Sequence, residues 1–210
     1  MKRLALLGAS GHGKVVADAA LASGWDEVEF FDDAWSQRSG NGLWPVTGDS
    51  ATLMARLKEF KGVVVSIGDC AVRWRKHQAF LIAGAPLVTV VHPAATVSRH
   101  ATLGLGTVVM AGAVVNIDAV VGEAGIINTG ATIDHDCQLG DAVHICPGVH
   151  LSGHVNVGNC SWVGVGAAVK QGISIGNNVL VGAGAVVVKN VTNGLTVIGN
   201  PAKPIDMRKV

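Results

Sequence analysis

The residues best suited to acid–base chemistry are histidines in the second half of the chain. Six of the eight histidines follow Val91. His135 lies between Asp134 and Asp136, so a carboxylate is available to orient its imidazole ring and to hold its pKa near or above neutrality. Such a ring is suited to act as a general base. The alternative interpretation is that His135 only forms hydrogen bonds at the surface or at an interface.

A glycine-rich segment near the N-terminus has the features of an anion-binding turn. Residues 8–13 have the sequence GASGHG and separate an expected strand from an expected helix, so backbone N–H groups would face a diphosphate. Asp32 and Asp33 end the next expected strand, where carboxylates can accept hydrogen bonds from ribose hydroxyls. The spacing is GxxGxG and not the GxGxxG of dinucleotide enzymes, and Gly68 lies at the same edge. A domain of about 88 residues is only half of what a full dinucleotide cradle requires, which favours a mononucleotide diphosphate over NAD. The alternative is a tight turn without a ligand.

The element that carries the histidines is defined by a six-residue repeat. Every sixth residue from Val91 to Val187 is Val, Ile or Leu, at all seventeen positions of this phase. A second regularity is a glycine that recurs every eighteen residues. Three hexapeptides therefore form one coil of a parallel β-helix, whose aliphatic side chains stack along the axis. The period indicates a three-sided coil and leaves its handedness open. The recurring glycines are Gly104, Gly122, Gly140, Gly158 and Gly176.

Before the repeat, apolar runs and turn residues indicate an α/β domain. We expect strands over 4–7, 28–31, 62–67 and 87–91, and helices over 14–22, 51–60 and 71–83. Residues 10–13 are expected to form a turn and residues 35–48 a loop. The alternation of strand and helix is typical of a Rossmann-like fold. We place the boundary so that residues 1–88 form this domain and residues 89–210 form the β-helix with a C-terminal tail.

The other histidines of the coil were weighed as partners of His135 and as metal ligands. His144 follows His135 by nine residues, half a coil, so the two lie on different sides of one prism and can meet only across an interface between protomers. His150 and His154 are interpreted as surface hydrogen-bonding residues. Trimeric coils can hold zinc between protomers with three neutral histidines. No pair here has the five-residue offset of the γ-class carbonic anhydrases, so we expect no metal.

Composition excludes several classes of function. Sixteen Lys and Arg against fifteen Asp and Glu give a net charge of +1, which excludes the basic surface of a nucleic-acid-binding protein. No apolar run approaches the roughly 20 residues that span a membrane. The N-terminal apolar run is too short for a signal peptide, and the cysteines form no CxxC pair. We therefore expect a cytoplasmic protein. Its four cysteines are Cys70, Cys137, Cys146 and Cys160.

Several motifs spread over nearly the whole chain resemble one family, the bacterial sugar acetyltransferases. This family includes the UDP-4-amino-sugar N-acetyltransferases of the bacillosamine pathway and their sialic acid O-acetyltransferase relatives. The motifs are the sequence GASGHGK over residues 8–14, Phe31-Asp32-Asp33, Ile67-Gly68-Asp69, Asn128-Thr129, His135-Asp136-Cys137, His144 and Ile198-Gly199-Asn200-Pro201-Ala202-Lys203.

The resemblance implies a fold, an assembly and a reaction. The fold is a Rossmann-like domain followed by a left-handed parallel β-helix, and the assembly is a homotrimer with acetyl-CoA in a groove between adjacent coils. His135 becomes the base that removes a proton from the sugar C4 amine, oriented by Asp136, where the best-known members have Glu. The nucleotide-sugar residues are then Ser10, Gly11, His12, Asp32, Asp33 and Gly68. The acetyl-CoA residues are His144, contributed by the neighbouring protomer, Val165 and Ala183.

The resemblance favours one function over two others. It implies acetyl-CoA-dependent N-acetylation of a UDP-linked amino sugar in bacterial surface glycan or glycoprotein biosynthesis. O-acetylation of a sugar hydroxyl, as on a sialic acid, is the alternative within the same class. From a different class comes a trimeric scaffold with a nucleotide-sensing domain. The histidine-rich coil and the C-terminal motif count against that scaffold.

Overall fold

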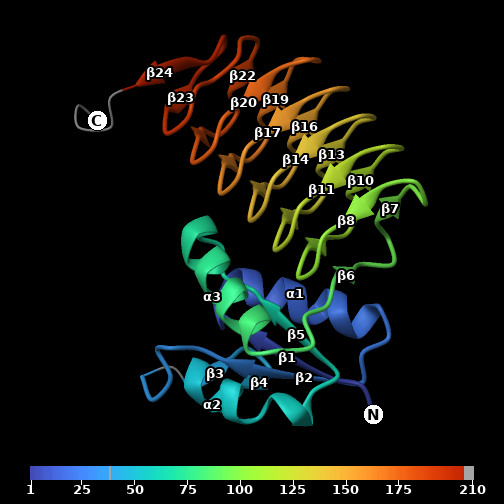
Figure 1. Ribbon diagram of the computed structural model, residues 1–210, viewed down its shortest axis with the longest axis vertical. Helices are drawn as coiled ribbons and strands as arrows, with labels where there is room; N and C mark the ends of the chain where they lie inside the picture. The colour runs from blue at the N-terminus through green and yellow to red at the C-terminus, as the bar shows by residue number, and fades with distance from the viewer. Residues whose placement is uncertain (38, 206–210) are drawn as a thin grey trace.

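The computed structural model describes residues 1–37 and 39–205. An α/β unit lies at one end, and a coil of short strands rises from it (Figure 1). Over the described residues, the α/β unit has a three-stranded parallel sheet in the order β2-β1-β5. Its elements are β1 Arg3–Leu7, α1 Gly11–Ala22, β2 Glu27–Phe31, β3 Gly40–Asn41, β4 Trp44–Pro45, α2 Ser50–Ala55, a 3₁₀ turn Leu57–Glu59, β5 Gly62–Val65 and α3 Cys70–Ile82.

Most expected element bounds differ from the structure by one or two residues, and four differ by more. Helix α1 begins at Gly11, because Ser10 has extended backbone angles and serves as its N-cap, so the expected turn over 10–13 is wrong. The expected helix over 51–60 breaks after Ala55 and continues as the 3₁₀ turn. The expected loop over 35–48 contains the two-residue hairpin β3-β4. The expected strand over 87–91 is reduced to a bridge between Leu87 and Val63 and to β6.

The repeat forms a prism whose three sides are sheets of parallel strands, except that the last strand, Lys203–Ile205, pairs antiparallel with Thr196–Ile198. Figure 1 shows the strands of residues 90–205 stacked coil upon coil. The eight-stranded side contains β6 Val90–Val91, β9 Val108–Val109, β12 Ile126–Ile127, β15 His144–Ile145, β18 Trp162–Val163, β21 Leu180–Val181, β23 Thr196–Ile198 and β24 Lys203–Ile205. The six-stranded side contains β7 Thr96–Val97, β10 Val114–Val115, β13 Thr132–Ile133, β16 His150–Leu151, β19 Ala168–Val169 and β22 Val186–Val187. The five-stranded side contains β8 Thr102–Leu103, β11 Val120–Val121, β14 Gln138–Leu139, β17 Asn156–Val157 and β20 Ser174–Ile175.

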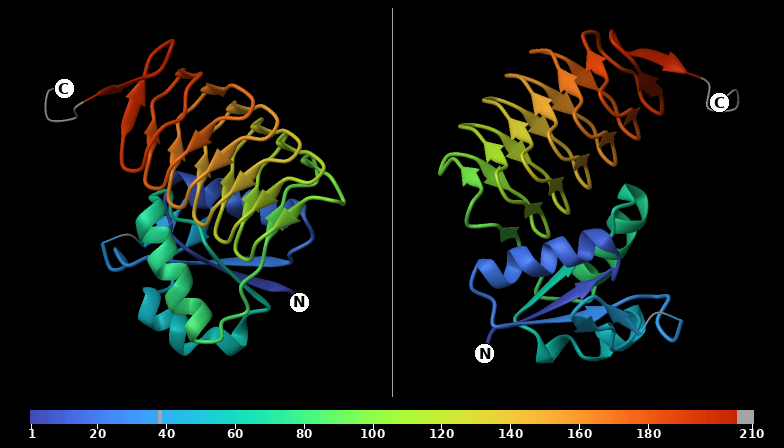
Figure 2. Two further views of the ribbon diagram at one scale, coloured as in Figure 1. Left: turned by 45° about the horizontal axis from the view of Figure 1, so that its top comes forward. Right: turned by 180° about the vertical axis from the view of Figure 1, so that it is seen from behind.

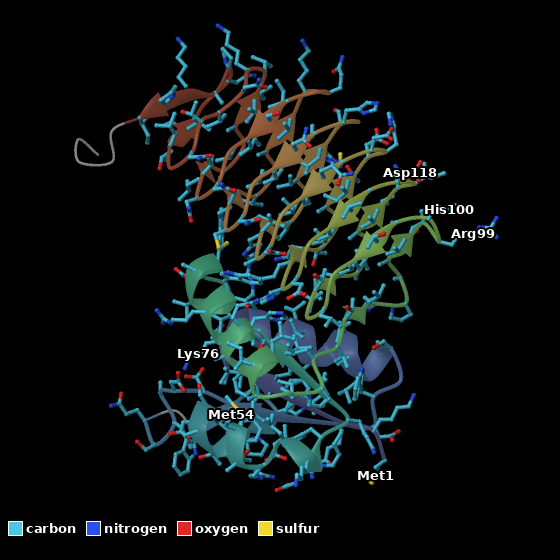
Figure 3. The ribbon with its side chains drawn as sticks, in the orientation of Figure 1. Met1, Met54, Lys76, Arg99, His100 and Asp118 are labelled. Carbon is cyan, nitrogen blue, oxygen red and sulfur yellow. The ribbon has the colours of Figure 1, made fainter. Side chains whose placement is uncertain are left out.

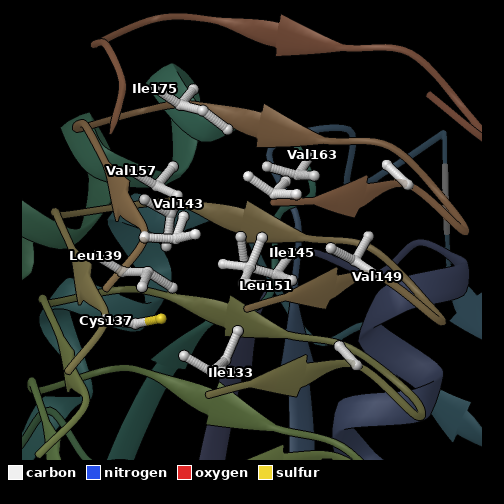
Figure 4. Close-up of a cluster of buried hydrophobic side chains, with 14 of the residues drawn as sticks. Ile133, Cys137, Leu139, Val143, Ile145, Val149, Leu151, Val157, Val163 and Ile175 are labelled. Atoms are coloured by element: carbon white, nitrogen blue, oxygen red, sulfur yellow. The ribbon is translucent and has the colours of Figure 1, made fainter. Parts of the chain in front are cut away.

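The repeat aliphatics form a ladder of side chains along the inside of this prism. Each stacks on the residue eighteen positions later, as Ile145 of β15 does on Val163 of β18. Figure 4 shows this ladder, with Ile133 and Leu151 on one side and Leu139 and Val157 on another. These residues are at most 3% exposed, so the interior of the coil is continuous apolar packing. The expected α/β domain followed by a parallel β-helix is confirmed.

The α/β unit packs against the eight-stranded side of the coil. Helix α1 lies between the sheet and the coil, as the right-hand view of Figure 2 shows. Val16 and Ala20 of α1 belong to the same apolar cluster as Met110 and Ile126 of the coil. Because this cluster is shared, the two parts hold each other in one arrangement. The boundary expected at residue 88 stays a prediction, although the coil begins close to it, at β6.

Candidate active site

Arg73 of α3 joins the α/β unit to the coil. Its side chain is 1% exposed, and among the residues that the structure describes its guanidinium donates only to uncharged groups. Its Nη1 donates to the carbonyls of Ile67 and Gly68, both at 2.7 Å. The Nε and the Nη2 reach coil carbonyls, those of Ala124 at 2.8 Å and Ala142 at 2.7 Å. These bonds fix the end of β5 against the coil, which positions the loop that follows β5.

Two imidazoles lie beside this guanidinium, one from each part of the protein. The rings of His12 and His144 have centroids 5.9 Å apart. Burial, reinforced by the charge of Arg73, lowers the pKa of His12 to about 4 and that of His144 to about 3. Both rings are therefore neutral near pH 7. His144 donates from Nδ1 to the carbonyl of Gly68 at 3.3 Å, so its Nε2 accepts from the amide of Asn128 at 3.3 Å.

His144 lines a groove along one edge of the prism. The groove has a volume of about 440 Å³, and the Trp162 ring packs on His144 with the centroids 4.0 Å apart. The structure thus brings together the three residues expected to bind acetyl-CoA. Their role stays a prediction. The residues of the groove are Asn128, His144, Cys146, Pro147, Trp162, Gly164, Val165, Leu180, Val181, Gly182 and Ala183.

The residues expected to hold the nucleotide sugar fall into separate places. Ser10, Asp32 and Asp33 line a hollow of about 250 Å³ at the carboxyl edge of the sheet. Gly68 lines a second hollow of about 440 Å³, which is bounded on the coil by Trp162. Gly11 is exposed at the start of α1, and His12 turns toward His144. Ser10, Asp32 and Asp33 therefore surround a different space from the one beside Gly68.

The two aspartates of this edge already bond within the chain. Asp32 accepts from the backbone N–H of Ala9 at 2.7 Å, which holds the glycine-rich turn against β2. Asp33 pairs with Lys76 at 2.5 Å and accepts from Ser50. Bonding to Lys76 and Ser50 lowers the pKa of Asp33 despite partial burial. The lowered pKa keeps Asp33 ionised near pH 7, and part of the hydrogen-bonding capacity of both aspartates is used within the chain.

His135 lies on a different edge of the prism from His144. It is in the turn between β13 and β14, where the six-stranded and five-stranded sides meet. The groove of His144 lies where β15 turns into β16, between the eight-stranded and six-stranded sides. Figure 3 shows Asp118, the equivalent of Asp136 one coil earlier, at the outer edge of the coil, away from α3. The two histidines therefore flank one side of the prism without meeting, as the repeat predicted.

The imidazole of His135 is held at Nδ1 by a carboxylate. Its Nδ1 donates to Asp136 at 2.6 Å, and its backbone N–H donates to Asp134 at 2.8 Å. The hydrogen bond with Asp136 is the largest effect and raises the pKa of His135; desolvation opposes it, and the charges of Asp134 and Asp136 add to the rise. Since Nδ1 carries the proton, Nε2 presents its lone pair to solvent. This arrangement can accept a proton from a substrate.

One group of side chains has the donor atoms for a metal ion. Among residues 1–37 and 39–205, ligand atoms of His135, Asp136 and His154 lie within 4.8 Å of one another. The spacing of His144, His150 and His154 along the chain gave no indication of this group. The expected absence of a metal stays a prediction.

No helix in the described part of the chain has the length and apolar character needed to cross a membrane.

The sequence patterns missed the residue that organises the domain interface. Helix α3 buries Cys70, Arg73, His77 and Phe80, a stripe at helical spacing. His77 is fully buried and reaches Glu123 of the coil at 3.0 Å. The signal in the sequence was that Arg73 and His77 fall on the apolar stripe of an amphipathic helix. Such groups are buried only where partners satisfy their hydrogen bonds and charge, so they indicate an interface.

Comparisons with known proteins identify relatives by sequence and by fold. A family model described as the PglD N-terminal domain matches residues 3–80. UDP-N-acetylbacillosamine N-acetyltransferase of Bacillus subtilis (strain 168) is 37% identical over 109 residues, so the match spans about half of this chain and half of that protein. The acetyltransferase domain of PglB from Neisseria gonorrhoeae FA1090 is 42% identical, with a TM-score of 0.92 over 98% of this chain and 100% of that one.

A further solved structure shares the fold with both ligands bound. It is PerB from Caulobacter crescentus in complex with CoA and GDP-perosamine, 38% identical, with a TM-score of 0.92 over 98% of each chain. The parallel β-helix with a groove at its edge and a histidine–carboxylate pair defines an acetyltransferase that uses acetyl-CoA. More narrowly, the chain belongs to the PglD-like sugar N-acetyltransferases.

Proposed function

We propose that the protein transfers the acetyl group of acetyl-CoA to the C4 amine of a UDP-linked amino sugar, in bacterial surface glycan or glycoprotein biosynthesis. The observation that carries the proposal is the 2.6 Å hydrogen bond between His135 and Asp136, which fixes the ring with Nε2 free to accept a proton. Four free cysteines fit a reducing cytoplasm as the compartment. The relatives named as N-acetyltransferases favour the amine over a sugar hydroxyl.

The chemistry needs one base and one positioned thioester. The amine lone pair attacks the thioester carbonyl while Nε2 of His135 takes a proton from the nitrogen. The tetrahedral intermediate then expels CoA as the thiolate, which receives that proton, so His135 returns to its neutral form. Asp136 stabilises the imidazolium between these two steps. His144 stays neutral and lines the groove beside the thioester, with its Nδ1 directed to Gly68.

The proposed active assembly is a homotrimer, which supplies what one prism lacks. His135 is on one edge of the six-stranded side, and the groove with Val165 and Ala183 is on the other edge. Prisms packed side by side would place the base edge of one protomer against the groove edge of the next. The exposure of the His135 and Asp136 side chains, 49% and 43%, is consistent with a site completed by a neighbour.

The expected nucleotide site is the hollow at the edge of the sheet. Its glycine-rich turn and the N-terminus of α1 favour a diphosphate, and Ser10 and Asp33 line it. UDP is the proposed nucleotide, although PerB was solved with GDP-perosamine. A competition assay therefore compares UDP- and GDP-linked 4-amino sugars as acceptors.

The test of the proposed function is a pair of variants assayed separately and together. With acetyl-CoA and a UDP-4-amino sugar, His135→Ala should lower kcat by about 10² to 10⁴ with little change in acetyl-CoA affinity. Ala183→Tyr should block the groove. Co-expressed in mixed trimers, the two variants should regain activity, because the intact base edge of one meets the intact groove of the other. Near-normal turnover by His135→Ala would remove the base, and no recovery in mixtures would exclude a shared site.

A further inference from the structure

The coil that follows His135 has a glycine, Gly153, at the place where the imidazole ring lies against it. A methyl group at Gly153 would be 2.5 Å from both Cε1 and Nε2 of His135, and 3.2 Å from Cδ2. The equivalent corner positions in other coils hold larger side chains, Arg99, Ile117 and Gln171. The ring of His135 thus fills the space that a side chain at position 153 would occupy.

The backbone does not require glycine at this position. Gly153 is not among the glycines with a left-handed φ, and arginine, isoleucine, histidine and glutamine occupy the same corner elsewhere. No backbone atom lies among the three nearest neighbours of the added methyl group. The glycine is therefore explained by the His135 ring and not by the turn, and the cost of a larger residue would fall on the position of that ring.

The next residue contacts the partner of His135. The Nε2 of His154 lies 3.5 Å from the same Asp136 oxygen that accepts from His135, and the two imidazole rings meet edge to face at 5.2 Å. His154 has a left-handed φ of 58°, at a corner where other coils place Asp118, Asp136 and Gly172. Residues other than glycine are uncommon at such an angle, although histidine, asparagine and aspartate adopt it more often than the rest. The carboxylate of Asp136 is thus held between two imidazoles from adjacent coils.

We infer that Gly153 and His154 are positioning residues for the His135–Asp136 pair, an inference that rests on the proposed role of His135 as the base. Gly153 leaves the space in which Nε2 faces the substrate, and His154 limits the movement of the carboxylate that orients the ring. Neither residue exchanges a proton with the substrate in this account. Both act through His135, so their effects should vanish when His135 is absent.

The first experiment uses Gly153→Ala, alone and combined with His135→Ala. The methyl group should displace the ring, so kcat should fall by about 10-fold or more, because displacements near 1 Å can cost up to about 10² in rate. The KM for acetyl-CoA and the midpoint of thermal unfolding should stay at their wild-type values. In the His135→Ala background the same substitution should cause no further loss. Gln171→Ala, in the same column one coil later, is the matched control and should keep wild-type kcat.

The second experiment uses His154→Gly, which suits the left-handed backbone, with His154→Asn as the conservative variant. His154→Gly should lower kcat severalfold without raising either KM. Nitrogen-15 NMR of the His135 side chain supplies a readout independent of turnover, since the Nδ1–H signal should shift in both Gly153→Ala and His154→Gly. Unchanged kcat and an unchanged signal would overturn the positioning roles while leaving His135 as base. Full activity of His135→Ala would instead overturn the proposed function.

Discussion

Arg73 and His144 donate to the same oxygen, the carbonyl of Gly68. The Nη1 of Arg73 lies 2.7 Å from it, and the Nδ1 of His144 lies 3.3 Å from it. The guanidinium thus fixes the acceptor that orients the imidazole, and its charge helps to keep that imidazole neutral. A residue outside the groove therefore fixes the acceptor that selects the tautomer of His144 and adds to the effect of burial that keeps this ring neutral.

Replacing Arg73 should weaken the whole domain interface. Arg73→Met keeps most of the volume but removes the donors to carbonyls of Ile67, Gly68, Ala124 and Ala142. Buried polar groups without partners cost about 1–3 kcal/mol each, so we expect a loss of about 3–5 kcal/mol in the free energy of unfolding. Urea denaturation at pH 7.5 measures it. Arg75→Met, on the exposed side of the same helix, should change stability by less than about 0.5 kcal/mol.

Stability should fall as the solution becomes acidic, because two buried histidines resist protonation. The folded pKa values of His12 and His144, about 4 and about 3, lie below the ordinary value of 6.5. The unfolded chain therefore binds more protons below pH 6.5, and each histidine contributes a loss of about 1.4 kcal/mol per pH unit down to its folded pKa. Denaturant unfolding between pH 7.5 and pH 5 measures the slope. His12→Gln should reduce it by about one proton, and an unchanged slope would contradict the buried neutral state.

The coil could be predicted from the sequence because its period repeats a single physical requirement. Positions such as Ile145 and Val163 must fill the same apolar axis once per coil, so one residue type recurs at a fixed spacing. The placement of His135 and His144 on different edges followed from counting residues along that period. The expected pairing of His135 with Asp136 is confirmed by their 2.6 Å contact, since adjacent residues at a corner need no tertiary information.

The arrangement around Arg73 could not be predicted in the same way. Its acceptors include backbone carbonyls of residues up to 70 positions away, and a carbonyl has no sequence signature. The direction of His12 depends on how α1 docks on the coil, which no local pattern encodes. The space beside Gly153 that the His135 ring fills depends on how two adjacent coils stack with their side chains. Tertiary packing, which links segments far apart in the chain, determines all three features.

A bulky residue in the groove should weaken the binding of the donor alone. Ala183 is exposed and lines the groove with Val165. Ala183→Tyr should raise the KM for acetyl-CoA by about 10-fold or more, because the ring would occupy space that we assign to the donor. The KM for the amino sugar should stay unchanged in the same assay. An equal rise in both constants would mean that the substitution disturbs the fold instead of the groove.

Removing the carboxylate beside His135 should shift the acidic limb of the pH–rate profile. The hydrogen bond with Asp136 is the largest cause of the raised pKa of His135, so in Asp136→Asn this pKa should fall toward 6.5. The base must be neutral to accept a proton, and the midpoint of the rise in kcat/KM should therefore move to lower pH, while the plateau falls because the imidazolium loses its stabilising charge. Asp118→Asn, at the same corner one coil earlier, serves as the control and should leave the midpoint in place. A midpoint that moves in both variants, or in neither, would show that the titration seen in kcat/KM does not belong to His135 bonded to Asp136.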